Sequence, residues 1–123
     1  MIDFAALIAQ MDEQRALWLD LAKLLPGKRL RYLRPLETDV DRLRGTHLRD
    51  LAEALAEFVT DWTGYTEADF LGNSQGSDAP VPFNRALFVR WVRDRMDVVA
   101  ELGSAIRGAV EAHRQAKDAA AKN

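Results

Sequence analysis

Cysteine is absent from this chain of 123 residues, and that absence excludes disulfide bonds and thiolate chemistry. Histidine occurs only at His47 and His113, and neither has a second ligand near it, so the three or four converging ligands of a zinc site are missing. No apolar run approaches the ~20 residues that a membrane span needs, and no basic region opens the chain as in a secretory signal. We therefore expect a soluble, cytoplasmic protein without a metal.

An excess of charge of either sign is also missing. The 17 basic and 19 acidic residues leave a net charge of −2, so no overall field attracts nucleic acid or anionic lipid. Hydrophobic residues at 48% and charged residues at 29% are ordinary for a globular domain. We expect a single domain over residues 1–123, with no nucleic-acid partner and no membrane partner.

Helical periodicity is present from the start of the chain. Asp3 is a candidate N-cap and Pro26 with Gly27 is a stop signal, so the pattern predicts one helix over 4–25. The polar turn 12–15 interrupts its apolar face, and we expect that turn to contact water. The apolar stripe of this helix consists of Phe4, Leu7, Ile8, Met11, Trp18, Leu21 and Leu25.

Similar patterns predict the other helices. Their expected ranges are 38–45, 46–62, 66–71 and 84–113, the last as one helix or two. Asn84 is the expected start of the final helical region. Residues 72–82 are rich in Gly, Asn, Ser, Asp and Pro and predict a long loop. From about residue 114 little apolar surface is left to bury, so we expect a polar, frayed tail.

The segment 28–34 has a different pattern. Leu30 and Tyr32 share one side of an extended chain, and Arg29 and Arg31 share the other, which fits a short strand or an irregular linker. No second strand pattern is found, so a strand here would need another copy or another protein as its partner. We therefore expect an all-α fold: a small helical domain of four to five helices with one long loop and this short segment.

Catalysis is the least favoured of three functional hypotheses. Acidic residues near the loop could serve a small hydrolase, namely Asp61, Glu67, Asp69 and Asp78. Paired carboxylates catalyse hydrolysis only where a pocket separates their pKa values, and acids at helix starts are usually caps. We expect no enzyme activity and no cofactor.

Partner binding is favoured instead. Aromatic residues flank the predicted loop, and exposed apolar patches often mark partner sites. The basic segment is a solvated edge or a contact for an acidic partner. The candidate partner-binding residues are Tyr65, Phe70, Phe83, Arg29, Arg31 and Tyr32. The remaining large aromatic residues lie on apolar stripes and are expected in the core: Trp18, Phe58, Trp62, Phe88 and Trp91.

Three short stretches carry a family resemblance. They are Arg31-Tyr32-Leu33-Arg34-Pro35, Val59-Thr60-Asp61-Trp62-Thr63-Gly64 and Ala79-Pro80-Val81-Pro82-Phe83-Asn84, followed by an amphipathic helix and a polar end. The chain resembles the tail assembly chaperones of long-tailed bacteriophages, in which a tryptophan-glycine element precedes a "pVPFs" helix start. The resemblance extends from Leu30 to the C-terminus and leaves the first helix unmatched. An insertion over 66–77 makes the spacer longer than is usual in that family.

The resemblance implies a mostly helical, non-enzymatic protein of the bacterial host cytoplasm. Such a chaperone binds the tape measure protein and keeps this long helical chain soluble while major tail protein subunits are recruited during virion assembly. Coating a long client would need many copies, so we also expect a homo-oligomer. The alternative is a small phage- or prophage-encoded helical regulatory or inhibitor protein that docks on a host protein complex through Lys28 to Arg34.

Overall fold

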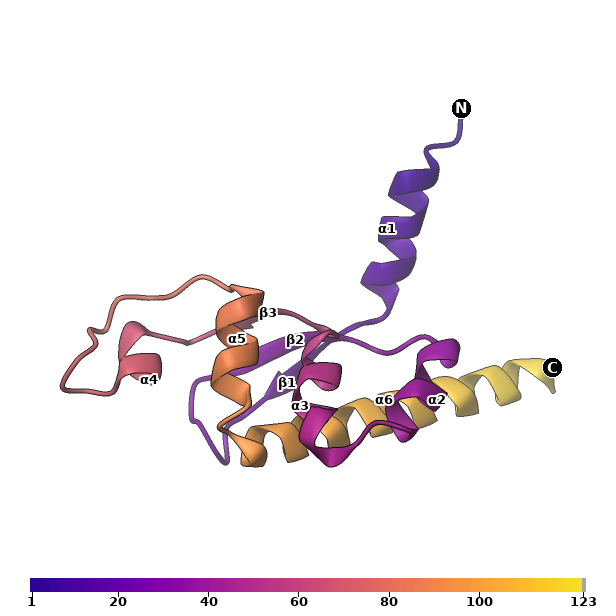
Figure 1. Ribbon diagram of the computed structural model, residues 1–123. Helices are drawn as coiled ribbons and strands as arrows, with labels where there is room; N and C mark the ends of the chain where they lie inside the picture. The colour runs from indigo at the N-terminus through magenta and orange to yellow at the C-terminus, as the bar shows by residue number, and fades with distance from the viewer. Residues whose placement is uncertain (123) are drawn as a thin grey trace.

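The computed structural model describes residues 1–122, and its fold is mixed α/β (Figure 1). Over these residues, six helices accompany a three-stranded antiparallel sheet of order β1-β2-β3, so the expected all-α class is wrong. The elements are α1 (Phe4–Gln14), β1 (Ala16–Asp20), β2 (Arg29–Leu33), α2 (Glu37–Arg44), α3 (Leu48–Ala56), β3 (Val59–Thr63), α4 (Glu67–Leu71), α5 (Arg85–Val92) and α6 (Met96–Ala121).

The central strand β2 is the segment that the sequence left open between strand and linker. Its alternation is as predicted, since Leu30 and Tyr32 are buried while Arg29 is exposed. Both of its partners come from the same chain, which corrects the expectation of a partner outside it. Leu30 is paired with Leu19 of β1 on one side and with Trp62 of β3 on the other.

Strand β1 replaces the second half of the first predicted helix. Helix α1 ends at Gln14, and β1 begins after one intervening residue. Leu17 lies opposite Tyr32 in the sheet, so its side chain is on the face that packs on the helices. Trp18 lies on the other face and is 40% exposed, contrary to its expected place in the core. The guanidinium of Arg29 stacks 4.6 Å from its ring centroid.

Strand β3 replaces the end of the helix predicted over 46–62. Helix α3 stops at Ala56, and the following Val-Thr-Asp-Trp-Thr sequence is rich in residues that favour strands. Gly64 ends the strand with φ +85°, a conformation that favours glycine. Its backbone packs directly on Gly27, which has φ +83° in the turn between β1 and β2.

The core lies between one face of the sheet and helices α3, α5 and α6. Phe58, Trp62 and Phe88 are buried there as expected, and Trp91 is half-buried against the same cluster. The buried core residues are Leu21, Leu30, Tyr32, Ala52, Leu55, Ala56, Phe58, Val59, Trp62, Tyr65, Phe88, Val92, Val98, Val99, Leu102 and Ile106. Helix α1 contributes no residue to this buried cluster.

The remaining helix predictions are mixed. Asp3 and Asn84 cap α1 and α5 through their side chains, and Thr66 begins α4, as expected. The final helical region is two helices, α5 and α6. Helix α6 continues to Ala121, so the frayed tail expected from about 114 is not what the structure shows. Among residues 1–122, no helix has the length and apolarity of a membrane span.

Candidate functional site

The aromatic residues that flank the loop gather around Trp62, and they gather inside the fold. The Tyr65 ring stacks on Trp62 with centroids 4.6 Å apart, while Phe70 and Phe83 lie 5.4 and 5.1 Å from it. Tyr65 is only 1% exposed, so its expected exposure is wrong, and Phe70 and Phe83 are half-buried. This cluster stabilises the core and offers little surface to a partner.

The loop over 72–82 covers this cluster because backbone hydrogen bonds join the loop to the start of α4. The amides of Glu67 and Ala68 donate to carbonyls of the loop at Ala79 and Ser77, both at 3.0 Å. The indole Nε1 of Trp62 donates to the carbonyl of Val81 at 2.7 Å. The tryptophan and the Val-Pro-Phe turn that carry the family resemblance are therefore structural partners in this fold.

The Tyr65 hydroxyl is buried, and it finds no hydrogen-bond partner among residues 1–122. Burial raises the pKa of this phenol far above its ordinary value, and the nearby Asp69 carboxylate raises it further. A buried hydroxyl without a partner costs free energy, since it has lost its bonds to water. Tyr65 therefore stabilises the fold through the packing of its ring, whereas its unpaired hydroxyl lowers the stability.

Replacing Tyr65 with phenylalanine tests this assignment. We expect the free energy of unfolding to stay the same or to rise by up to about 1 kcal/mol, because the ring remains and the unpaired hydroxyl is removed. Tyr32→Phe is the matched control, since the Tyr32 hydroxyl donates to the Ala105 carbonyl at 3.4 Å and its loss should cost about 0.5–1 kcal/mol. Urea denaturation of both variants measures the difference. A loss above about 1 kcal/mol in Tyr65→Phe would contradict this assignment.

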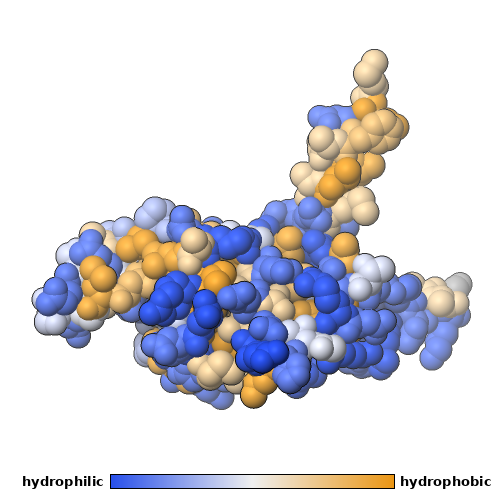
Figure 2. Space-filling model, viewed as in Figure 1, coloured by the Kyte–Doolittle hydropathy of each residue, from blue (hydrophilic) through white to orange (hydrophobic). Residues whose placement is uncertain are grey.

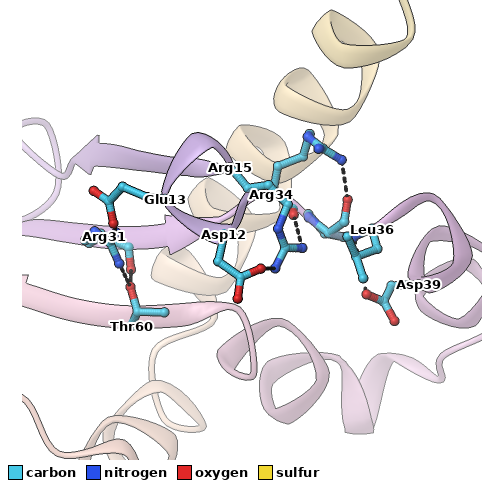
Figure 3. A network of polar contacts seen from close by, with 9 residues as sticks. Asp12, Glu13, Arg15, Arg31, Arg34, Leu36, Asp39 and Thr60 are labelled. Carbon is cyan, nitrogen blue, oxygen red and sulfur yellow. Dashed lines mark hydrogen bonds and ion pairs between the residues drawn. The ribbon is translucent and has the colours of Figure 1, made fainter. Parts of the chain in front are cut away.

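The basic residues of the candidate set lie elsewhere and are largely engaged within the chain. The Arg31 guanidinium pairs with Glu13 at 2.6 Å and donates to the Thr60 hydroxyl at 2.7 Å (Figure 3). Lys28 pairs with Asp69 at 2.9 Å. Burial alone would raise the pKa of Asp69, but hydrogen bonds from Thr66 and Lys28 lower it overall. Arg31 and Lys28 are therefore engaged within the chain, whereas Arg29 is exposed and stacks on Trp18.

The six candidate residues therefore do not form one surface. Tyr32 is buried on the helix-covered face of the sheet, whereas Arg29 and Arg31 lie on the opposite face. The acids near the loop are also occupied by local roles. Asp69 accepts from the Thr66 amide as a cap, and Glu67 accepts from the Ser77 amide. Within residues 1–122, no group of three or more His, Asp or Glu side chains is placed to hold a metal ion.

An apolar surface that the sequence analysis missed lies on α1, which we call the arm. The arm leaves the body of the protein and carries apolar side chains into solvent (Figure 2). None of the residues Phe4–Gln14 is buried. Four of them, at helical spacing, form a continuous apolar face that we call the arm stripe: Phe4 at 68% exposed, Leu7 at 48%, Ile8 at 60% and Met11 at 59%.

The direction of the arm is fixed at its root. Arg15 alone joins α1 to β1, and its guanidinium donates to the Arg34 carbonyl at 2.8 Å and to Asp12 at 3.2 Å (Figure 3). The backbone of Arg15 also accepts from the Arg34 amide at 2.9 Å. Together with the ion pair between Glu13 and Arg31, these bonds hold the last turn of the arm to the sheet.

A pocket of about 560 Å³ lies where the arm meets the body, and we call it the base pocket. Leu17 and Leu36 in its wall are 42% and 48% exposed, so the pocket has an exposed apolar wall. Its apolar lining is Met11, Leu17, Leu36, Ala109 and Ala112, and its polar lining is Asp12, Gln14, Arg15, Arg34 and His113. Because Met11 belongs to both, the arm stripe and the base pocket are one continuous surface.

A signal for this site was present in the polar turn 12–15, which separates the stripe of Phe4 to Met11 from the apolar residues after it. One helix over 4–25 would have buried both parts, whereas a break at that turn leaves the first part without a covering element. Neither the composition nor the periodicity shows which part is covered.

Comparisons of the chain with family models, with curated proteins and with solved structures give no match in any of the three.

Proposed function

We propose that this protein is a non-enzymatic binding protein whose arm holds an amphipathic helix of another chain. The observation that carries the proposal is the arm stripe, an exposed apolar face of four residues. Burying one such side chain contributes roughly 1.5–3 kcal/mol, so the stripe is costly to leave uncovered. Amphipathic helices bind through apolar residues at the same i, i+3, i+4, i+7 spacing that the stripe presents.

The client we propose is a tape measure protein, so that the protein acts as a phage tail assembly chaperone in the host cytoplasm and helps to recruit major tail protein subunits. The sequence resemblance supports this client. The alternative is a regulatory protein that docks on a host complex through the basic segment. It has less support, because Lys28 and Arg31 already pair with Asp69 and Glu13.

Co-expression with the tape measure protein of the same phage tests the proposal. We expect the client to be recovered soluble and in complex with the protein. Ile8→Glu should weaken the complex at least about tenfold, because it places a charge in the apolar stripe. Ala9→Glu is the matched control, since it adds the same charge to the opposite side of the same exposed helix and should leave binding unchanged.

Two results would overturn the proposal. In the first, the client remains insoluble whether or not the protein is present. In the second, Ile8→Glu and Ala9→Glu retain the client equally well, which would place the binding surface away from the arm stripe. Charge reversal at Arg29, whose side chain is exposed, tests in the same pull-down whether the basic segment contributes to client binding, because it should leave binding unchanged if the arm stripe is the contact.

A further inference from the structure

We infer that two copies of this protein pair through their arms in an antiparallel arrangement, with the end of each arm lying on the base pocket of the other copy. The inference stands on the geometry of α1 and of the base pocket alone. It concerns the protein without a client, and a client helix that binds the arm stripe would have to displace the second arm. The mass of the protein alone therefore tests the pairing, and recovery of a soluble client tests the proposed function.

The arm cannot cover the base pocket of its own chain. A single residue, Arg15, connects α1 to β1, and a helix cannot reverse its direction over one residue. The bonds from Arg15 to Arg34 and from Glu13 to Arg31 hold the root in its present direction. The eleven-residue helix then carries Phe4 about 15 Å from its root. Only a second chain can place an arm on this pocket.

A second arm fits this requirement because the arm stripe is complementary to itself. In an antiparallel pair, Phe4 lies opposite Met11 of the second copy, and Leu7 lies opposite Ile8. Both contacts occur twice, as two-fold symmetry demands. The same arrangement brings the end of each arm, with Phe4 and the 66% exposed Ile2, to the root of the other arm. The base pocket begins at that root, beside Met11.

The area to be buried favours this arrangement over contact between the arms alone. The four residues of the arm stripe are between 48% and 68% exposed, and together they offer roughly 400 Å² of largely apolar surface per copy. A stable interface buries about 800 Å² per partner, so the stripe is too small by itself. The exposed walls of the base pocket, Leu17 and Leu36, extend the same surface onto the body.

The first test is the mass of the protein alone in solution. Sedimentation velocity at about 100 μM should give twice the chain mass of 13.8 kDa, and dilution should return the monomer. Ile8→Glu should raise the dissociation constant at least tenfold, while Ala9→Glu should leave it unchanged. Circular dichroism checks that both variants fold. A wild-type monomer at every concentration, or equal dimerisation of the two variants, overturns the inference.

The second test is the direction of the two arms, and it uses the absence of cysteine from the chain. Phe4→Cys mixed with Met11→Cys should form a disulfide-linked pair of the two variants under mild oxidation. Phe4→Cys alone should not, because seven residues of helix separate the two thiols by about 10 Å, beyond the roughly 7 Å limit for a disulfide. Cross-linking of Phe4→Cys alone would show parallel arms, and no cross-linking in either sample would place the contact elsewhere. Both results contradict the inference.

Discussion

Gly64→Ala is expected to lower the free energy of unfolding by about 3 kcal/mol or more. Gly64 has φ +85°, which a residue with a Cβ adopts only with strain. A Cβ at this position would also overlap the backbone carbonyl oxygen of Gly27 and lie 3.3 Å from the Lys28 Cα. Because both neighbours are backbone atoms, the turn between β1 and β2 would have to move away from the end of β3. Urea denaturation measures the loss.

Two other glycines separate the causes of this loss. Gly27 has φ +83° but open space around it, so Gly27→Ala measures backbone strain alone, at about 1–2 kcal/mol. Gly108 lies exposed within α6, and an added Cβ would meet no other heavy atom within 4 Å among the described residues. Gly108→Ala should therefore stabilise the protein by about 0.5–1 kcal/mol. Equal effects of Gly64→Ala and Gly27→Ala would show that the two turns do not touch.

Phe88→Ala is the second large effect, with an expected loss of about 4 kcal/mol. Phe88 is fully buried, and its ring lies 6.2 Å from both Trp62 and Trp91 and 6.3 Å from Phe83. Removal of the Phe88 ring leaves a cavity within the aromatic cluster. The neighbouring rings of Trp62, Phe83 and Trp91 cannot fill this cavity without moving. Thermal and urea denaturation should both show the loss.

Phe4→Ala on the arm is the control for Phe88→Ala, because it deletes the same ring from a position that is 68% exposed. At a concentration where the protein is monomeric, we expect a change in the free energy of unfolding within about 0.5 kcal/mol. A loss of several kcal/mol in Phe4→Ala would mean that the arm packs on the body of its own chain.

Local chemistry predicted the features that depend on a few neighbouring residues. The side-chain caps at Asp3 and Asn84 need only the first turn of their helices, and both are present. The alternation of Leu30 and Tyr32 with two arginines similarly identified the face of β2 that is buried. The positions of Pro26 and Gly27 marked a real turn, although the element before it was assigned wrongly.

The sheet could not be predicted because it depends on pairing between distant segments. The apolar residues around Trp18 and around Trp62 fit a helical stripe as well as they fit an alternating strand, and short segments of this kind are ambiguous. What decides between the two is the row of backbone donors and acceptors that β2 offers on both edges. The β-branched residues Val59, Thr60 and Thr63 were the local signal for β3.

The candidate site was predicted in the wrong place for a related reason. A stripe of large apolar residues indicates burial, and the sequence does not say whether the covering surface belongs to the same chain. Tyr65 beside a loop of small polar residues was expected to be exposed, yet the loop folds back over it. The stripe of Phe4 to Met11 has the spacing of a buried helix face, yet none of its residues is buried within this chain.

The isolation of α1 has a thermodynamic consequence. An eleven-residue helix is shorter than the ~12–15 residues that sustain helical structure in water, and Phe4–Gln14 receives no support from the core. Between its Asp3 cap and its root, its helical hydrogen bonds are therefore of marginal stability wherever no other chain covers them. If another chain binds the arm as we propose, association and coil-to-helix ordering in this segment become a single coupled equilibrium, in which part of the contact free energy orders the backbone.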